Sequence, residues 1–349
     1  MNYTASYLND IDTAISAINC KEKLFHRSIL ITGSSGMICS PVIDILFALN
    51  KKYDAHIKIH IAGRNRERIV KRFAPFKCST DFEFIRFDAT MDVSLDTATD
   101  YIIYGASNAD PVSLNRYPVE TVLTNIIGLH SLLKYSFEKK IKRLLYISSG
   151  EIYGIKNNGE PYREDDYGYI DVLNARACYP CSKRAAENLC ISYTKEYAVD
   201  TVIVRPGHIY GPTITETDSR ASAQFTRDAL AKKDIVMKSG GAQLRSYCYV
   251  MDCASALLTV LLAGKTGNAY NIANPNSTVT VRRLAQEFAD ASGTKIIFQN
   301  ATDAEKKSYN LMENSSLDST KLEALGWKPR FSLKDGVSRT LEILQENGN

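Results

Sequence analysis

The chain has 349 residues and a formal net charge of +4, with 44% hydrophobic and 23% charged residues. This composition is that of a globular protein with a sizeable core, and no cluster of Lys and Arg interleaved with aromatic residues supports nucleic-acid binding. The N-terminus lacks the basic and apolar regions of a signal peptide, and no apolar stretch reaches the roughly 18 residues that a membrane span needs. We therefore expect a cytoplasmic protein without a membrane partner.

Apolar runs alternate with helical patterns through the first 205 residues. Strands are expected at 28–33, 57–62, 82–87, 101–104, 144–147 and 201–204, and the longer helices at 119–137 and 179–197. Strands that alternate with helices at this spacing predict an α/β fold of Rossmann type, with a doubly wound parallel sheet covered by helices on both faces.

Three regions follow from this pattern. Residues 1–27 form an N-terminal extension that is expected to pack as an added helix, and residues 28–205 form the dinucleotide-binding domain. After Arg205-Pro206 the segments become turn-rich and polar. Residues 206–349 are therefore expected to form mainly a smaller substrate-binding region, which is interleaved with the sheet domain and partly returns to it.

A glycine-rich segment, TGSSGMIC at 32–39, lies between the first strand and the first helix. Gly33 permits a tight turn, and Gly36 lets the backbone approach a pyrophosphate at the helix N-terminus. Cys39 stands where a third glycine usually allows close packing of helix and strand, so a slightly looser fit is expected. Such a turn also occurs between strands and helices without a ligand, but its place after the first strand favours dinucleotide binding.

The end of the second strand discriminates between the two nicotinamide cofactors. An acidic residue there would accept hydrogen bonds from the adenosine ribose. This chain has Arg64 and Arg66 instead, with no carboxylate before Glu67. Because arginine binds phosphate oxygens well, we favour NADP over NAD; alternatively, both arginines are solvated charges at the start of a helix.

Tyr179 and Lys183 lie four residues apart, on one face of a predicted helix. A phenol with a pKa near 10 is a poor base at neutral pH, but a nearby cation favours the phenolate, which could accept a proton from a sugar hydroxyl. The spacing alone also fits a surface pair. About thirty residues earlier, SSGEIYG at 148–154 places a serine at the carboxyl end of a strand, where it would face the cofactor crevice.

The eight cysteines are scattered through the sequence, and without a secretion signal they are expected to be reduced thiols. Cys178 and Cys181 form a C-x-x-C pair, but no second Cys or His pair stands at zinc-like spacing. Since structural zinc normally needs four ligands, we expect no metal site.

The ordered motifs resemble the NAD-dependent epimerase/dehydratase family of extended short-chain dehydrogenases/reductases. The matching blocks are TGSSGMIC at 32–39, ASNADP at 106–111, SSGEIYG at 148–154, RACYPCSK at 176–183, RPGHIYGP at 205–212, RSYCYVMD at 245–252 and LGW at 325–327. The resemblance implies that Ser149, Tyr179 and Lys183 are catalytic. Together with the preceding observations it places these residues at the cofactor: Gly33, Ser35, Gly36, Met37, Ile38, Arg64, Asp88, Ala106, Asn125, Tyr179 and Lys183.

The resemblance also bears on the reaction, which we expect to pass through a transient 4-keto sugar. Glu151 resembles the acid that the family's dehydratases and UDP-glucuronate decarboxylases carry and its plain epimerases usually lack. Many hexose dehydratases have an Asp where this chain has Gly150, and the decarboxylases usually have an Arg that grips the substrate carboxylate within the stretch corresponding to 313–318, where this chain has none. Decarboxylation, a net NADP-dependent sugar-nucleotide dehydrogenase or reductase, and a non-catalytic NADP-binding sensor therefore stand as alternatives.

The substrate implied by the family is a nucleoside-diphosphate sugar. Arg245 is the candidate for its diphosphate, since a guanidinium can chelate phosphate oxygens. Arg220 is interpreted equally as a substrate contact or as a structural ion pair, and Tyr249 as half core and half pocket wall. His208 is expected to be satisfied by the backbone. Apolar faces on the helices after Ala109 and at 179–197 favour a homodimer, as in relatives.

Overall fold

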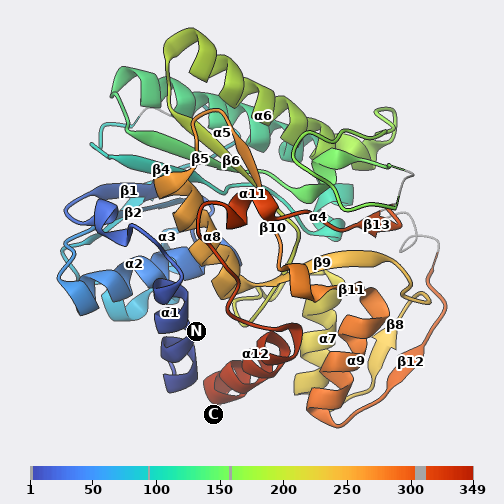
Figure 1. The fold of residues 1–349 in the computed structure, drawn as a ribbon. Helices are drawn as coiled ribbons and strands as arrows, with labels where there is room; N and C mark the ends of the chain where they lie inside the picture. Colours follow the sequence, from blue (N-terminus) through green and yellow to red (C-terminus); the bar gives the residue numbers. More distant parts are fainter. Residues whose placement is uncertain (1–2, 93–94, 157–158, 303–311, 349) are drawn as a thin grey trace.

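The computed structural model describes residues 3–92, 95–156, 159–302 and 312–348, and it consists of a sheet domain with a smaller lobe beside it (Figure 1). Within these residues the main sheet has seven parallel strands in the order β10-β6-β5-β4-β1-β2-β3. The strands are β1 (Ser28–Ile31), β2 (Lys58–Gly63), β3 (Phe82–Arg86), β4 (Tyr101–Tyr104), β5 (Arg143–Ile147), β6 (Thr201–Pro206) and β10 (Ala269–Ile272). The predicted doubly wound α/β fold is confirmed.

Helices cover both faces of this sheet. In Figure 1, α5 (Pro118–Glu138) and α6 (Cys178–Tyr197) lie above it, and α2 (Cys39–Tyr53) and α8 (Val250–Ala263) lie below it. The central strands are therefore buried on both sides: in β1, Leu30 belongs to the apolar cluster on the α5–α6 side, while Ile29 and Ile31 belong to the other. Burial of both faces explains why β1, β4 and β5 are nearly continuous apolar runs, whereas the edge strand β3 exposes Glu83 and Arg86.

The strand order reverses between β1 and β4. At such a switch point the loops after neighbouring strands diverge and leave a crevice at the carboxyl ends of the strands. The turn after β1 and the loops after β4 and β5 all reach this edge. Four short helices follow the strands: α3 (Arg66–Arg72) after β2, α4 (Pro111–Arg116) after β4, and η3 (Gly150–Tyr153) and η4 (Ala175–Ala177) after β5.

The smaller lobe is built from the later part of the chain, although β10 returns to the main sheet. Strand β9 (Leu244–Tyr249) pairs with β7 (His208–Tyr210), β11 (Thr278–Thr280) and β13 (Asn314–Ser315), and β8 (Ile235–Met237) pairs with β12 (Ile296–Phe298). In this region α7 (Ala221–Leu230), α9 (Val281–Ser292) and α12 (Leu333–Gly348) pack together, whereas α11 (Thr320–Glu323) contacts β10 of the main sheet.

The expected added helix near the N-terminus is α1 (Ala5–Ser16), which lies between α2 and α12. Its Tyr7 hydroxyl donates to the buried Asp44 carboxylate at 2.5 Å, and Arg72 forms an ion pair with the same carboxylate. Asp10 on α1 accepts from Arg339 of α12 at 2.8 Å. Polar contacts thus fasten both ends of the chain to the sheet domain.

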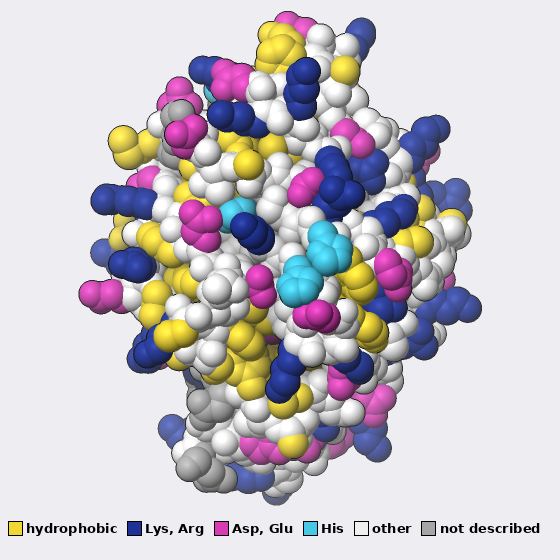
Figure 2. Space-filling view, turned by 90° about the vertical axis from the view of Figure 1, so that its left-hand side faces the viewer, with side chains coloured by type: hydrophobic (Ala, Val, Ile, Leu, Met, Phe, Trp, Pro, Cys, Tyr) yellow, Lys and Arg dark blue, Asp and Glu magenta, His cyan; other side chains and the backbone are white. Residues whose placement is uncertain are grey.

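The surface in Figure 2 carries Lys and Arg side chains interspersed with Asp and Glu, and shows no large patch of a single sign on this face. Among the described residues, no helix is long and apolar enough to cross a membrane.

Candidate active site

The turn after β1 brings the backbone unusually close to the loop after β4. Gly33 has a φ of +65°, and a Cβ there would lie 2.4 Å from the Gly105 carbonyl oxygen, so only glycine fits. The Thr32 hydroxyl accepts from the Gly105 and Ala106 amides at 3.0 and 3.2 Å and holds the two loops together. The Cys39 sulfur lies 2.3 Å from where a Cβ of Gly105 would stand. The packing is therefore tight, and the expectation of a looser fit at Cys39 is wrong.

A cavity of about 310 Å³ opens over this turn. It is lined by six of the residues predicted to bind the cofactor, namely Gly33, Ser35, Gly36, Arg64, Asp88 and Ala106. Met37, Ile38 and Asn125 do not line it; the Asn125 amide nitrogen donates to Ser182 on α6 at 2.9 Å. Glycine backbone beside a helix N-terminus at the switch point is an arrangement that fits a dinucleotide.

The end of β2 adds two residues that sequence reasoning missed. Asn65 and Arg68 line the cavity together with Arg64, because the Asn65 side chain caps α3 by accepting from the Arg68 amide at 2.9 Å. Arg66 is not among the residues that line the cavity. Arg64 pairs with Glu120 at 3.2 Å, and its side chain is 61% exposed. Two guanidinium groups therefore stand at this end of the cavity.

Ser149, Tyr179 and Lys183 come together between β5 and α6. The Lys183 ammonium is buried; it donates to the Ile147 carbonyl at 2.7 Å and lies 5.6 Å from the Tyr179 ring centroid. Burial lowers the pKa of Lys183 from 10.5 to about 7. Ser149 caps η3 by accepting from the Glu151 amide at 3.1 Å.

The ionisation of Tyr179 differs from the expectation. Its pKa is raised to about 12, first by burial and then by the Glu151 carboxylate. A hydrogen bond with Ser149 and the charges of Arg176 and Arg220 lower it, whereas Lys183 is not among its leading influences. Arg176 and Arg220 are the leading cations that lower the pKa of Tyr179, and the Lys183 ammonium lies 5.6 Å from its ring centroid.

Glu151 and Arg176 form an ion pair that the sequence did not reveal. Arg176 in η4 donates from Nη2 to Glu151 Oε1 at 3.0 Å, and their side chains are 13% and 26% exposed. Arg176 opens the RACY motif three residues before Tyr179, and that place in the motif is the signal that could have pointed to it.

The predicted substrate residues fall into two groups. Arg245 is buried and donates to the carbonyls of Leu244 and Glu313, and no carboxylate pairs with it among the described residues. Arg220 forms the ion pair with Asp218 at 2.5 Å, and its charge still reaches Tyr179. Both lie on the crevice side.

Tyr249 does not belong to the site. Its hydroxyl donates to Asp10 on α1 at 2.7 Å, and the side chain is buried against Phe331. The prediction that Tyr249 contacts the substrate is wrong, because β9 directs this side chain toward α1 and not toward the crevice.

Several buried polar atoms around the crevice have no hydrogen-bond partner within the described part of the chain. They include Ser148 Oγ, Asn125 Oδ1, Arg176 Nε, His208 Nδ1 and Ser315 Oγ. The expectation that His208 is satisfied by the backbone therefore does not hold for Nδ1, and burial lowers the pKa of His208 to about 3, so its ring is neutral. Buried polar atoms without partners are rare in proteins, and a bound ligand or water molecule would complete their hydrogen bonding.

Comparison with known proteins identifies the family. Residues 29–273 match the NAD dependent epimerase/dehydratase family. The chain belongs to that family. UDP-glucuronic acid decarboxylase 3 of Arabidopsis thaliana is 28% identical over 312 residues, which cover 88% of this chain and 86% of that protein. UDP-glucuronic acid decarboxylase 1 of Xenopus tropicalis is 28% identical over 327 residues, covering 92% and 72%.

Solved structures share the fold of this family member. A UDP-glucose 4-epimerase from Thermotoga maritima superposes with a TM-score of 0.77 at 22% identity, covering 92% of this chain and 100% of that one. A dTDP-glucose 4,6-dehydratase from Streptomyces venezuelae gives 0.78 at 22% identity, covering 92% and 97%. The family predicted from the ordered motifs is confirmed, and with it an NAD-dependent enzyme.

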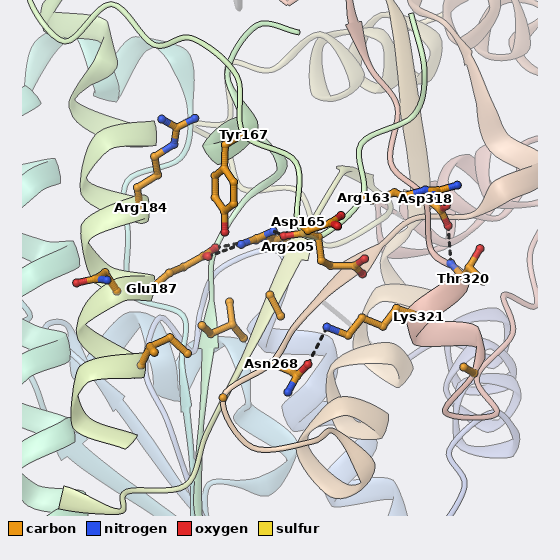
Figure 3. Close-up of a pocket in the computed structure, with 17 residues that line it drawn as sticks. Arg163, Asp165, Tyr167, Arg184, Glu187, Arg205, Asn268, Asp318, Thr320 and Lys321 are labelled. Atoms are coloured by element: carbon orange, nitrogen blue, oxygen red, sulfur yellow. Dashed lines mark hydrogen bonds and ion pairs between the residues drawn. The ribbon is translucent and has the colours of Figure 1, made fainter. Parts of the chain in front are cut away.

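A second and larger cavity of this epimerase/dehydratase family member lies away from the catalytic residues. It has a volume of about 1120 Å³ and lies between α6, the edge strand β10 and α11 (Figure 3). The charges around it are largely satisfied: Arg205 pairs with Glu187 at 2.7 Å, and Lys321 donates to Asn268 at 2.9 Å. None of the predicted site residues lines it.

Proposed function

We propose that this enzyme binds a nucleoside-diphosphate sugar and oxidises it transiently at C4, so that the resulting 4-keto sugar is epimerised or dehydrated before the hydride returns. The observation that supports this most directly is the convergence of Ser149, Glu151 and Tyr179 at the carboxyl end of β5. Relatives named as UDP-glucuronic acid decarboxylases support the substrate class.

The proposed chemistry divides among few residues. A bound nicotinamide would supply the acceptor and later the donor of the hydride. Tyr179 accepts the proton of the C4 hydroxyl, and the Ser149 hydroxyl donates a hydrogen bond to the same oxygen. In the dehydration, a ketone at C4 acidifies the C5 proton, and the Glu151 carboxylate removes it. The protonated Glu151 then gives this proton to the departing C6 hydroxyl, so that the C6–O bond breaks and water leaves. Lys183 donates a hydrogen bond to the Ile147 carbonyl and lies beneath the Tyr179 ring. From this position it would orient the bound cofactor.

Arg245 is the proposed ligand of the diphosphate. It is a buried guanidinium whose partners among the described residues are two carbonyl groups, so its remaining donors can chelate phosphate oxygens. Ser315 stands opposite it in the β9–β13 pairing, with an unpartnered hydroxyl. Ser315 belongs to the segment 313–318, where this chain lacks the Arg with which decarboxylases bind the substrate carboxylate. Because this segment pairs with the strand that carries Arg245, we favour a neutral sugar over a uronate as the substrate.

Decarboxylation of UDP-glucuronate is the second candidate, because the curated relatives carry that name. One experiment distinguishes the two candidate reactions. The protein is incubated with UDP-, GDP-, CDP- and dTDP-sugars, including UDP-glucuronate, and the products are identified by mass spectrometry and by nicotinamide absorbance. A product changed in mass or configuration without net cofactor reduction supports the internal redox cycle, and loss of CO₂ assigns the decarboxylase. Accumulation of reduced cofactor would contradict the proposal and support a dehydrogenase.

For the cofactor we propose NADP in preference to NAD. Arg64 and Arg68 supply two guanidinium groups at the end of the cavity, and the β2 end offers no carboxylate for the ribose. Arg64→Ala should weaken NADP binding about tenfold, as expected for a lost charge-assisted contact, and leave NAD binding unchanged. Arg66→Ala, which removes an exposed charge outside the cavity lining, is the control. Equal losses for both cofactors would refute the preference.

We also propose a homodimer formed through α5 and α6. On α5, Val119 is 69% exposed and Leu123 is 38% exposed, and on α6 Ile191 is 38% exposed. Exposed apolar side chains on two neighbouring helices favour a protein–protein contact there. Sedimentation of the wild type and of Val119→Glu tests this proposal: a dimer that becomes a monomer supports it, and a monomeric wild type rejects it.

A further inference from the structure

We propose that Arg176 is a positioning residue that holds the Glu151 carboxylate in its place for proton transfer; the inference rests on the proposed function of Glu151. Arg176 stands in η4, directly before the helix that carries Tyr179 and Lys183, while Glu151 stands in η3 after β5. The ion pair therefore joins η3, which carries Glu151, to η4, which directly precedes the helix with Tyr179.

The geometry of this pair differs from that of an ion pair built for stability. Arg205 and Glu187 form a forked pair, with Nε donating to Oε1 at 3.0 Å and Nη2 to Oε2 at 2.7 Å. Arg205 also donates from Nη1 to the Tyr153 hydroxyl at 2.9 Å. Every nitrogen of that guanidinium has a partner, as expected for a buried structural charge.

Arg176 contacts Glu151 through Nη2 alone, and its Nε is buried without a partner within the described residues. A buried donor left unsatisfied costs free energy of folding, so the arrangement is a poor way to stabilise the fold. Such costs are tolerated where a side chain serves the site. The single contact also leaves the second oxygen of Glu151 outside the pair, available to a proton of the substrate.

The surrounding charges explain why Glu151 needs this partner. Arg245 on β9 is close enough for the two charges to influence each other, and it has no carboxylate of its own among the described residues. The charges of Glu151 and Arg176 also act on Tyr179 of α6: Glu151 raises the pKa of the phenol and Arg176 lowers it. Without Arg176, the Glu151 carboxylate would still be attracted by Arg245, the proposed diphosphate ligand. Arg176 thus keeps the base near the sugar and away from the diphosphate.

The test compares Arg176→Met with Glu151→Gln, Arg176→Lys and Arg205→Met on a substrate that the wild type converts. Arg176→Met should lose less melting temperature than Arg205→Met, because Arg176 makes a single hydrogen bond to Glu151 whereas Arg205 bonds through every nitrogen. Its kcat should fall about 100-fold with KM changed less than about threefold, since misplacing a reacting group by ~1 Å costs this much. Incorporation of solvent deuterium at the sugar carbon should fall in parallel, and Arg176→Lys should recover part of kcat.

The double variant Arg176→Met/Glu151→Gln distinguishes a positioning role from an independent one. If Arg176 acts through Glu151, the double variant should be no slower than Glu151→Gln alone. A kcat of Arg176→Met within about twofold of the wild type, while Glu151→Gln is impaired, would overturn this inference and leave the proposed function standing. An unimpaired Glu151→Gln would overturn the proposed role of Glu151 and this inference together.

Discussion

The buried ammonium of Lys183 should make the stability of the cofactor-free protein depend on pH in the neutral to alkaline range. The side chain is 2% exposed, and its one hydrogen bond among the described residues goes to the Ile147 carbonyl at 2.7 Å. No carboxylate lies within ion-pair distance of it in that part of the chain. Burial therefore lowers its pKa from 10.5 to about 7, and the attraction of Glu187 offsets this only in part.

The sign and the magnitude follow from linkage. Between pH 7 and 10.5 the unfolded chain holds a proton on Lys183 that the folded protein has lost, so the free energy of unfolding rises with pH in this window. Each unit of difference corresponds to about 1.36 kcal/mol. Between pH 7 and pH 9 the contribution integrates to about 2 kcal/mol. The stabilisation is complete above pH 10.5 and is lost as the pH falls through about 7.

Urea denaturation of the wild type and of Lys183→Met at pH 7, 8 and 9 isolates this group, because other titrating residues contribute equally to both proteins. Lys183→Met should be the more stable at pH 7, and its advantage should shrink by about 2 kcal/mol by pH 9. Tyr179→Phe serves as the control, since the phenol titrates near 12 and lies outside the window. A constant difference across the three pH values would show that the folded ammonium keeps its ordinary pKa.

Two further substitutions test the packing of the site. Gly105→Ala should abolish cofactor binding and lower the melting temperature, because its Cβ would stand 2.3 Å from the Cys39 sulfur; adding Cys39→Gly should recover part of both, measured by thermal melting with and without cofactor. Tyr249→Phe should cost about 1–2 kcal/mol of unfolding free energy through the lost hydrogen bond to Asp10, with kcat and KM unchanged. A kinetic defect in Tyr249→Phe would return this residue to the substrate site.

Much of the fold could be predicted because burial on both faces makes the central strands apolar runs. Strand β4 at Tyr101–Tyr104 was predicted with the observed bounds, and β5 differs by one residue. Strand β10 was not predicted individually; it pairs with β6 from more than sixty residues away. Its neighbour in the sheet depends on how the smaller lobe folds, which no local pattern contains.

The site residues also differ in how far the sequence alone predicts them. Gly33 and the pair of Tyr179 and Lys183 lie in contiguous motifs, and their neighbours follow from the spacing of a turn or a helix. Arg176 is 25 residues from Glu151, and its role depends on how the intervening chain returns to the crevice. The error at Tyr249 has a similar origin, because its partner Asp10 is 239 residues distant. Side chains whose direction is set by remote packing cannot be assigned from local spacing.

The ionisation of Tyr179 differs from what its motif alone predicts. The motif places a cation four residues from Tyr179, which predicts a lowered pKa for the phenol. In the folded protein the same burial that brings the groups together raises the pKa of Tyr179 to about 12 and lowers that of Lys183 to about 7. The charges of Arg176 and Arg220 lower the pKa of Tyr179 but do not offset its burial. Since a base works best with a pKa near the working pH, the proposed role of Tyr179 requires that binding of cofactor and substrate lowers this pKa.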